Sequence, residues 1–206
     1  IGYSDITALH AALTQYSNIV TIHGPMLTSF KAEYSDYTAK NFAEGLRNTQ
    51  APGVVPLPQG AAMQTLIPGK AEGTIIGGNL TIINSLVGTP YAIDGRGKLL
   101  FIEEVGESPY RIDRALQQLW QSGLLQQVNG IVYGEFYDCN HDVDEGDFTL
   151  DEILTYYGLL AGVPVMKGIP AGHDKDNYFL PMGTHAVMDA RQDGTAELIL
   201  DEAYAE

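Results

Sequence analysis

The chain has 206 residues, of which 45% are apolar, and a formal net charge of −15. This balance predicts a globular protein with a substantial core and argues against a nucleic-acid or anionic-membrane surface, because both need clustered Lys and Arg. A single cysteine excludes an internal disulfide, and no apolar run reaches the length of a membrane helix, so we expect a cytoplasmic protein.

The first residues have the pattern of a strand that turns sharply into a helix, with Ser4 at the corner. Apolar residues at helical spacing predict that this helix runs from Asp5 to about Ser17. Backbone N–H groups at a helix start have no internal partner, so the amide of Asp5 could hold an oxyanion. This pattern is typical of a nucleophile elbow, although Ile6 replaces the second glycine of the usual motif. The alternative is that Ser4 is an ordinary helix cap.

Strand and helix alternate in the residues that follow. A β-branched strand over 19–22 ends at His23, and a helix is expected from Ser35 to Leu46, which together favour an α/β fold. The Pro- and Gly-rich stretch 51–73 is interpreted as a linker with one or two short strands. Because an elbow strand normally has several residues before its corner, we expect a longer protein upstream.

Residues 74–206 are predicted to form a C-terminal α/β domain with a mixed sheet. Its strands are expected at 74–76, 99–102, 131–133, 163–166, 178–180, 185–189 and 196–200, and its helices at 80–86, 110–122 and after a capping box at Thr149–Glu152. The pair Gly77-Gly78 could cradle a phosphate but lacks a dinucleotide or P-loop spacing. The acidic stretch 138–147 lacks the Gly and Glu of a calcium loop. We therefore expect no metal and no cofactor.

A serine nucleophile needs a base and an acid that orients the base. His173 follows a glycine-rich turn after an apolar strand, where open α/β sheets place ligands. Glu103 ends another apolar strand, where a carboxylate is costly unless it is paired, and Glu104 must point to the other face. His23 could line the same pocket. The residues alone leave open that both glutamates simply begin a solvated loop.

Six ordered segments resemble the signature segments of the serine LD-carboxypeptidases, a family that includes muropeptide-trimming enzymes and microcin-immunity peptidases. These segments are Gly2-Tyr3-Ser4-Asp5, His23-Gly24-Pro25, Gly77-Gly78-Asn79-Leu80, Leu100-Phe101-Ile102-Glu103-Glu104, Tyr110-Arg111-Ile112-Asp113-Arg114 and Gly168-Ile169-Pro170-Ala171-Gly172-His173. The resemblance implies Ser4 as nucleophile, Glu103 as acid and His173 as base. It also implies an active site between two α/β domains, with residues 1–50 as the remnant of the N-terminal one, and an upstream glycine-rich segment that has no counterpart in this chain.

The activity implied by the resemblance is removal of the terminal D-alanine from murein tetrapeptides during cell-wall recycling, without metal or cofactor, by a homodimer. A basic group should bind the substrate carboxylate, and Arg111 and Arg114 are candidates, with His23 as a further substrate-binding candidate. Two alternatives remain. One is a microcin-immunity peptidase acting on a peptidyl-nucleotide, and the other is a truncated, non-catalytic muropeptide-binding module. The sequence leaves open whether the third peptide position is lysine or diaminopimelate.

Overall fold

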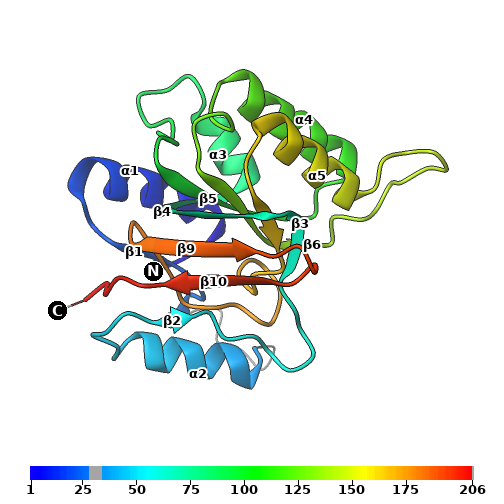
Figure 1. Cartoon of the computed structure of the whole chain (residues 1–206). Helices are drawn as coiled ribbons and strands as arrows, with labels where there is room; N and C mark the ends of the chain where they lie inside the picture. Colours follow the sequence, from blue (N-terminus) through cyan, green and yellow to red (C-terminus); the bar gives the residue numbers. More distant parts are fainter. Residues whose placement is uncertain (28–33, 206) are drawn as a thin grey trace.

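An eight-stranded mixed sheet forms the centre of the computed structural model, which describes residues 1–27 and 34–205 (Figure 1). The strand order is β2-β10-β9-β4-β5-β6-β7-β3. The strands are β2 (Gly53–Val54), β3 (Gln64–Ile67), β4 (Gly69–Asn79), β5 (Lys98–Val105), β6 (Gly130–Tyr137), β7 (Val165–Lys167), β9 (His185–Ala190) and β10 (Ala196–Leu200). Strands β4 to β7 are parallel, and the strands outside them pair antiparallel. The α/β class and the mixed sheet predicted from the sequence are therefore confirmed.

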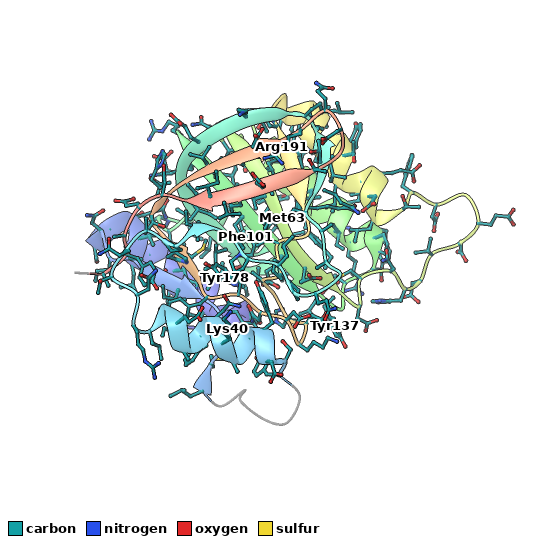
Figure 2. The ribbon with its side chains drawn as sticks, turned by 60° about the horizontal axis from the view of Figure 1, so that its bottom comes forward. Lys40, Met63, Phe101, Tyr137, Tyr178 and Arg191 are labelled. Carbon is teal, nitrogen blue, oxygen red and sulfur yellow. The ribbon has the colours of Figure 1, made fainter. Side chains whose placement is uncertain are left out.

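Three helices gather on one side of this sheet in Figure 1: α3 (Leu80–Leu86), α4 (Pro109–Gln121) and α5 (Leu150–Ala161). Leu100 and Ile102 of β5 face them and join a buried cluster with Leu116 of α4. The intervening Phe101 faces the opposite side, where Figure 2 shows it in the interior with Met63 and Tyr178. Because successive residues of a strand alternate between faces, Glu103 shares the face of Phe101 and Glu104 the helical face.

The N-terminal part of the chain is joined to the remainder through a small second sheet. Residues Ser4–Ile6 form a 3-10 turn that leads directly into α1 (Thr7–Ser17). Strand β1 (Thr21–His23) pairs antiparallel with β8 (Leu180–Met182). Helix α2 (Asp36–Gly45) begins at Ser35, whose side chain accepts a hydrogen bond from the amide of Thr38. A late segment of the chain thus pairs with the strand that follows the serine turn.

The stretch 51–73, expected to be a linker with one or two short strands, contributes strands to the main sheet. Residues 53–73 contain β2, β3 and the first half of β4, so the predicted boundary between residues 73 and 74 lies inside one strand. Glycine is needed there for close strand approach, because a Cβ at Gly73 would lie 2.3 Å from the carbonyl oxygen of Gly97. Gly73 therefore reflects close packing of backbone within the sheet rather than linker flexibility. Residues 53–73 are part of that sheet.

Two further expectations concern local structure. Thr149 and Glu152 form the reciprocal capping box at the start of α5, as predicted. Within residues 1–27 and 34–205, no helix is long and apolar enough to cross a membrane. The same described residues, the acidic stretch 138–147 among them, hold no group of three or more His, Cys, Asp or Glu side chains arranged to bind a metal.

Candidate active site

Ser4 occupies a strained turn between a short extended segment and α1. Its φ of 62° lies in the left-handed region, which is uncommon for a residue other than glycine. Gly2 is fixed on both sides, because its amide donates to the carbonyl of Ile22 at 3.0 Å and its carbonyl accepts from Gly24 at 3.1 Å. Ser4 is partly exposed, and its hydroxyl forms no hydrogen bond in the described part of the chain. Ser4 is therefore not a helix cap.

The start of α1 is anchored at the carboxyl ends of β4 and β5. The amide of Asn79 donates to the hydroxyl of Thr7 at 2.9 Å. A Cβ at Gly78 would lie 2.3 Å from that hydroxyl, and one at Gly77 would lie 2.0 Å from the carbonyl oxygen of Phe101. The glycine pair considered as a phosphate cradle thus accommodates α1 and a neighbouring strand. These contacts hold the serine turn over the end of the parallel sheet.

Glu103 and His173 form a hydrogen-bonded pair beside this turn. The Nδ1 atom of His173 lies 2.8 Å from Oε2 of Glu103, whose side chain is fully buried. Burial acts to raise the pKa of Glu103, but the hydrogen bond from His173 and the nearby His23 outweigh it and lower the pKa to about 2. An ionised carboxylate only accepts hydrogen bonds, so the bond requires a proton on Nδ1 of His173. In the neutral ring, Nε2 is then free to accept a proton.

His173 also contacts the residue that precedes Ser4. The rings of Tyr3 and His173 pack edge to face, with centroids 4.9 Å apart. The approach of the His173 loop depends on Gly172, because a Cβ there would lie only 3.3 Å from Oε2 of Glu103. The structure therefore brings the serine turn, the histidine and the glutamate to one place. Asp5 directly follows Ser4 in the same 3-10 turn.

None of the three basic side chains predicted to bind substrate lies exposed beside Ser4: His23 is buried, and Arg111 and Arg114 are on the other face of the sheet. His23 is fully buried, with its Nε2 atom 3.7 Å from Oε1 of Glu103. Arg111 and Arg114 line a shallow pocket of about 180 Å³ on the helical face of the sheet, together with Glu104. Arg111 donates to the hydroxyl of Tyr110 at 3.0 Å. The structure does not bring the two arginines to Ser4, Glu103 or His173, since they lie on the opposite face of β5.

One acidic residue of the site was missed from the sequence. The pairing of β5 with β6 shifts register at Glu103, so two residues of β6, Gly134 and Glu135, lie opposite that one residue. This β-bulge directs Glu135 toward the His173 loop, where burial, Asp174 and Asp176 raise its pKa to about 7. A glycine within an apolar strand run is the signal that predicts such a bulge.

Comparison with known proteins identifies the family that has this arrangement. Residues 72–188, more than half of the chain, match the LD-carboxypeptidase C-terminal domain. The chain belongs to the LD-carboxypeptidase family. A probable murein peptide carboxypeptidase of Bacillus subtilis is 38% identical over 93% of this chain. The chain spans 60% of that relative's length.

Two further members show the breadth of the LD-carboxypeptidase family. The crystal structure of muramoyltetrapeptide carboxypeptidase from Oxalobacter formigenes superposes with a TM-score of 0.79 and 29% identity, covering 97% of this chain and 68% of that one. The microcin C7 self-immunity protein MccF of Escherichia coli is 27% identical over 92% of this chain and 62% of its own length. The family assignment therefore establishes a peptidase fold, and its relatives are named for muramoyl peptides in one case and for immunity to microcin C7 in the other.

Proposed function

We propose that this chain carries the catalytic residues of a serine-type LD-carboxypeptidase that releases the terminal D-alanine from murein tetrapeptides. The observation that carries the proposal is the buried Glu103–His173 hydrogen bond beside a serine held at a positive φ. The names of the murein peptide carboxypeptidases among the relatives support the substrate. Because the chain spans about 60% of those relatives, the activity of the whole protein is part of the proposal.

The proposed reaction follows the roles of a serine, a histidine and a carboxylate. The hydroxyl of Ser4 attacks the carbonyl carbon of the L,D-peptide bond while Nε2 of His173 takes its proton. Glu103 keeps Nδ1 of His173 protonated and stabilises the imidazolium that forms. The amide of Asp5 donates to the developing oxyanion. His173 then protonates the amine of the departing D-alanine, which leaves an acyl-enzyme at Ser4.

Deacylation repeats these steps with water as the nucleophile. His173 takes a proton from the water, the new tetrahedral intermediate collapses, and the tripeptide carboxylate leaves as Ser4 regains its proton. Every proton and leaving group is accounted for by these side chains, so the proposed reaction includes no metal and no cofactor. The proposal also includes a cytoplasmic location, where murein fragments would be recycled, and a homodimer.

The substrate branch is the main alternative. The relationship to MccF allows the same serine chemistry on a peptidyl-nucleotide or acyl-sulfamoyl adenylate. The identity to the B. subtilis murein peptide carboxypeptidase is higher, at 38% against 27%, which favours the muropeptide. A binding module without catalysis is the second alternative, and the intact Glu103–His173 pair argues against it.

Mass spectrometry of a murein tetrapeptide incubated with the chain tests the proposal. The parent should release one alanine, and Ser4→Ala and Glu103→Gln should each lower the rate by at least about a thousandfold. Ser17→Ala, at the far end of α1, is the matched control and should retain parental activity. An acyl-sulfamoyl adenylate in a parallel reaction tests the other branch. Equal tetrapeptide binding by parent and Ser4→Ala, with no release of alanine by either, would identify a binding module instead.

A further inference from the structure

One oxygen of the buried Glu103 carboxylate lacks a hydrogen-bond partner. Oε2 accepts from His173, but Oε1 has less than 1 Å² of exposed surface and no donor within hydrogen-bond distance. A buried oxygen of an ionised carboxylate is expensive to leave unpaired, because it has lost water without replacement. We therefore expect a hydrogen-bond donor of the protein itself to pair with Oε1 of Glu103.

The side chain that faces Oε1 is His23, and it is equally unpaired. Its exposed fraction is 0%, and neither ring nitrogen forms a hydrogen bond in the described structure. Its Nε2 atom lies 3.7 Å from Oε1 of Glu103. Two hydrogen bonds of about 2.8 Å that meet at a bridging water span about 4.5 Å, so a water does not fit between these atoms. A shift of less than about 1 Å would instead complete a direct N–H···O bond.

Strand pairing and ring packing hold His23 in place. His23 ends β1, where it pairs with Leu180 of β8 and forms a parallel bridge with Gly2. The ring of Phe101 packs against the His23 ring edge to face, with centroids 5.0 Å apart. The nearby His10 is already engaged, because its Nε2 atom bonds to the carbonyl of Gly2 at 2.9 Å. Oε1 of Glu103 is thus an unpaired acceptor 3.7 Å from Nε2 of His23.

We propose that His23 is a positioning residue that donates an Nε2–H hydrogen bond to Oε1 of Glu103 in the working enzyme. The inference deepens the proposed function and rests on it for its catalytic consequence. With both oxygens held, the carboxylate cannot rotate away from Nδ1 of His173, and the imidazole keeps the orientation that directs Nε2 toward Ser4. The lowered pKa of Glu103 agrees with a carboxylate that stays ionised between two imidazoles.

This role replaces the expectation that His23 contacts substrate. The side chain of His23 has no exposed surface, so it does not contact a ligand bound beside Ser4. His23 also connects Glu103 to the segment that precedes the serine turn. The backbone of Gly2 forms hydrogen bonds with Ile22 and Gly24, the residues on either side of His23. The acid, the base and the nucleophile are therefore supported by one local network.

Two substitutions of His23 separate a hydrogen-bonding role from a packing role. Gln places an amide N–H near the position of Nε2, whereas Leu fills the apolar surroundings of Phe101 without a donor. We expect His23→Leu to lower kcat by about 10-fold to 100-fold with little change in KM, and His23→Gln to recover most of that loss. If His23 served only in packing, His23→Leu would instead have a higher kcat than His23→Gln. Thr21→Val, a change in the same strand that removes a buried unpaired hydroxyl, is the matched control and should keep parental kcat.

A readout without activity keeps this test independent of the proposed reaction. In NMR spectra of chain labelled with ¹⁵N-histidine, the parent should show a proton on Nε2 of His23 and a low-field proton on Nδ1 of His173. The His173 resonance should shift or broaden in His23→Leu and return in His23→Gln and Thr21→Val. An unprotonated Nε2 in His23, or an unchanged His173 resonance in His23→Leu, would overturn the inference. Loss of peptidase activity with these signals intact would count against the proposed function only.

Discussion

The carboxylates of Glu103 and Glu104 are adjacent in β5 but lie on opposite faces of the sheet and have different partners. Glu103 accepts from His173 at 2.8 Å. Glu104 accepts from the side chain of Asn79 at 2.8 Å and from the amide and hydroxyl of Thr81 at 2.9 and 2.6 Å. The second carboxylate thus ties the start of α3 to β5, whereas the first one orients the candidate base.

We predict that Glu104→Ala destabilises the fold by about 2 to 4 kcal/mol. The substitution removes the acceptor of the buried Asn79 side chain and of the amide and hydroxyl of Thr81 at the start of α3, and leaving a buried donor unpaired costs about 1 to 3 kcal/mol. Urea denaturation at pH 7 measures the change. Glu107→Ala, which removes a partly exposed carboxylate from its pair with Arg111, is the control and should change stability by less than about 1 kcal/mol. Equal effects of the two substitutions would show that the contacts of Glu104 add little.

Glu103 should make stability depend on pH in the acid range. Its pKa is lowered from an ordinary value of 4.5 to about 2, so its stabilising contribution is present above pH 4.5 and is lost as the pH falls toward 2. Glu103→Gln should therefore lose less stability than the parent between pH 5 and pH 2.5. Urea midpoints at these two pH values measure the difference. An identical acid loss in both proteins would mean that the carboxylate gains nothing from its two histidine neighbours.

The sequence predicted the fold class and the location of most elements, because periodicity and caps are local properties. It also placed Glu103 and Glu104 on opposite faces, since alternation in a strand decides that. It predicted one or two short strands within 51–73, but not that these strands belong to the main sheet. Gly73 allows the close approach of the backbone at Gly97, and a glycine needed for such a distant contact cannot be told from a linker glycine by composition.

Placement of side chains within the site was less accessible to sequence reasoning. His23 was expected to line a pocket, yet the packing of β1 against β8 buries it completely. Arg111 and Arg114 follow β5 closely in sequence but lie on its helical face, which depends on how α4 packs. Glu135 was missed because its orientation depends on a register shift between two strands. Each of these features follows from tertiary contacts, and of the three only the bulge at Glu135 has a local signal, the preceding Gly134.

Glu135 should oppose folding at alkaline pH. Burial, Asp174 and Asp176 raise its pKa from 4.5 to about 7, so the protonated side chain favours the folded state. That contribution is complete below pH 4.5 and is lost as the pH rises through 7. Glu135→Gln should therefore have a higher Tm than the parent at pH 8 and a difference that is much smaller at pH 4.5. A constant difference across this range would show that the carboxyl does not titrate differently in the folded state.

Gly78→Ala should disturb the serine turn from a distance. A Cβ there would lie 2.3 Å from the hydroxyl of Thr7, and the φ of +139° is unfavourable for alanine, so we expect a loss of at least about 2 kcal/mol and reduced activity. Gly97→Ala is the matched control, because its φ of +70° is also positive but no atom lies within 4 Å of the new Cβ. Thermal unfolding of both variants isolates the effect of the clash. Similar losses would mean that α1 moves aside without cost.

The positive φ of Ser4 should make the candidate nucleophile a source of strain. A left-handed backbone costs a residue with a Cβ about 1 to 2 kcal/mol, whereas glycine adopts it freely but adds about 0.4 to 1 kcal/mol of unfolded-state entropy. Ser4→Ala keeps the strain and removes the hydroxyl, and Ser4→Gly removes both. We therefore expect both variants to be inactive and Ser4→Gly to be more stable than Ser4→Ala by up to about 1 kcal/mol. Urea denaturation of the pair measures this, and a less stable Ser4→Gly would show that the turn stores no strain to release.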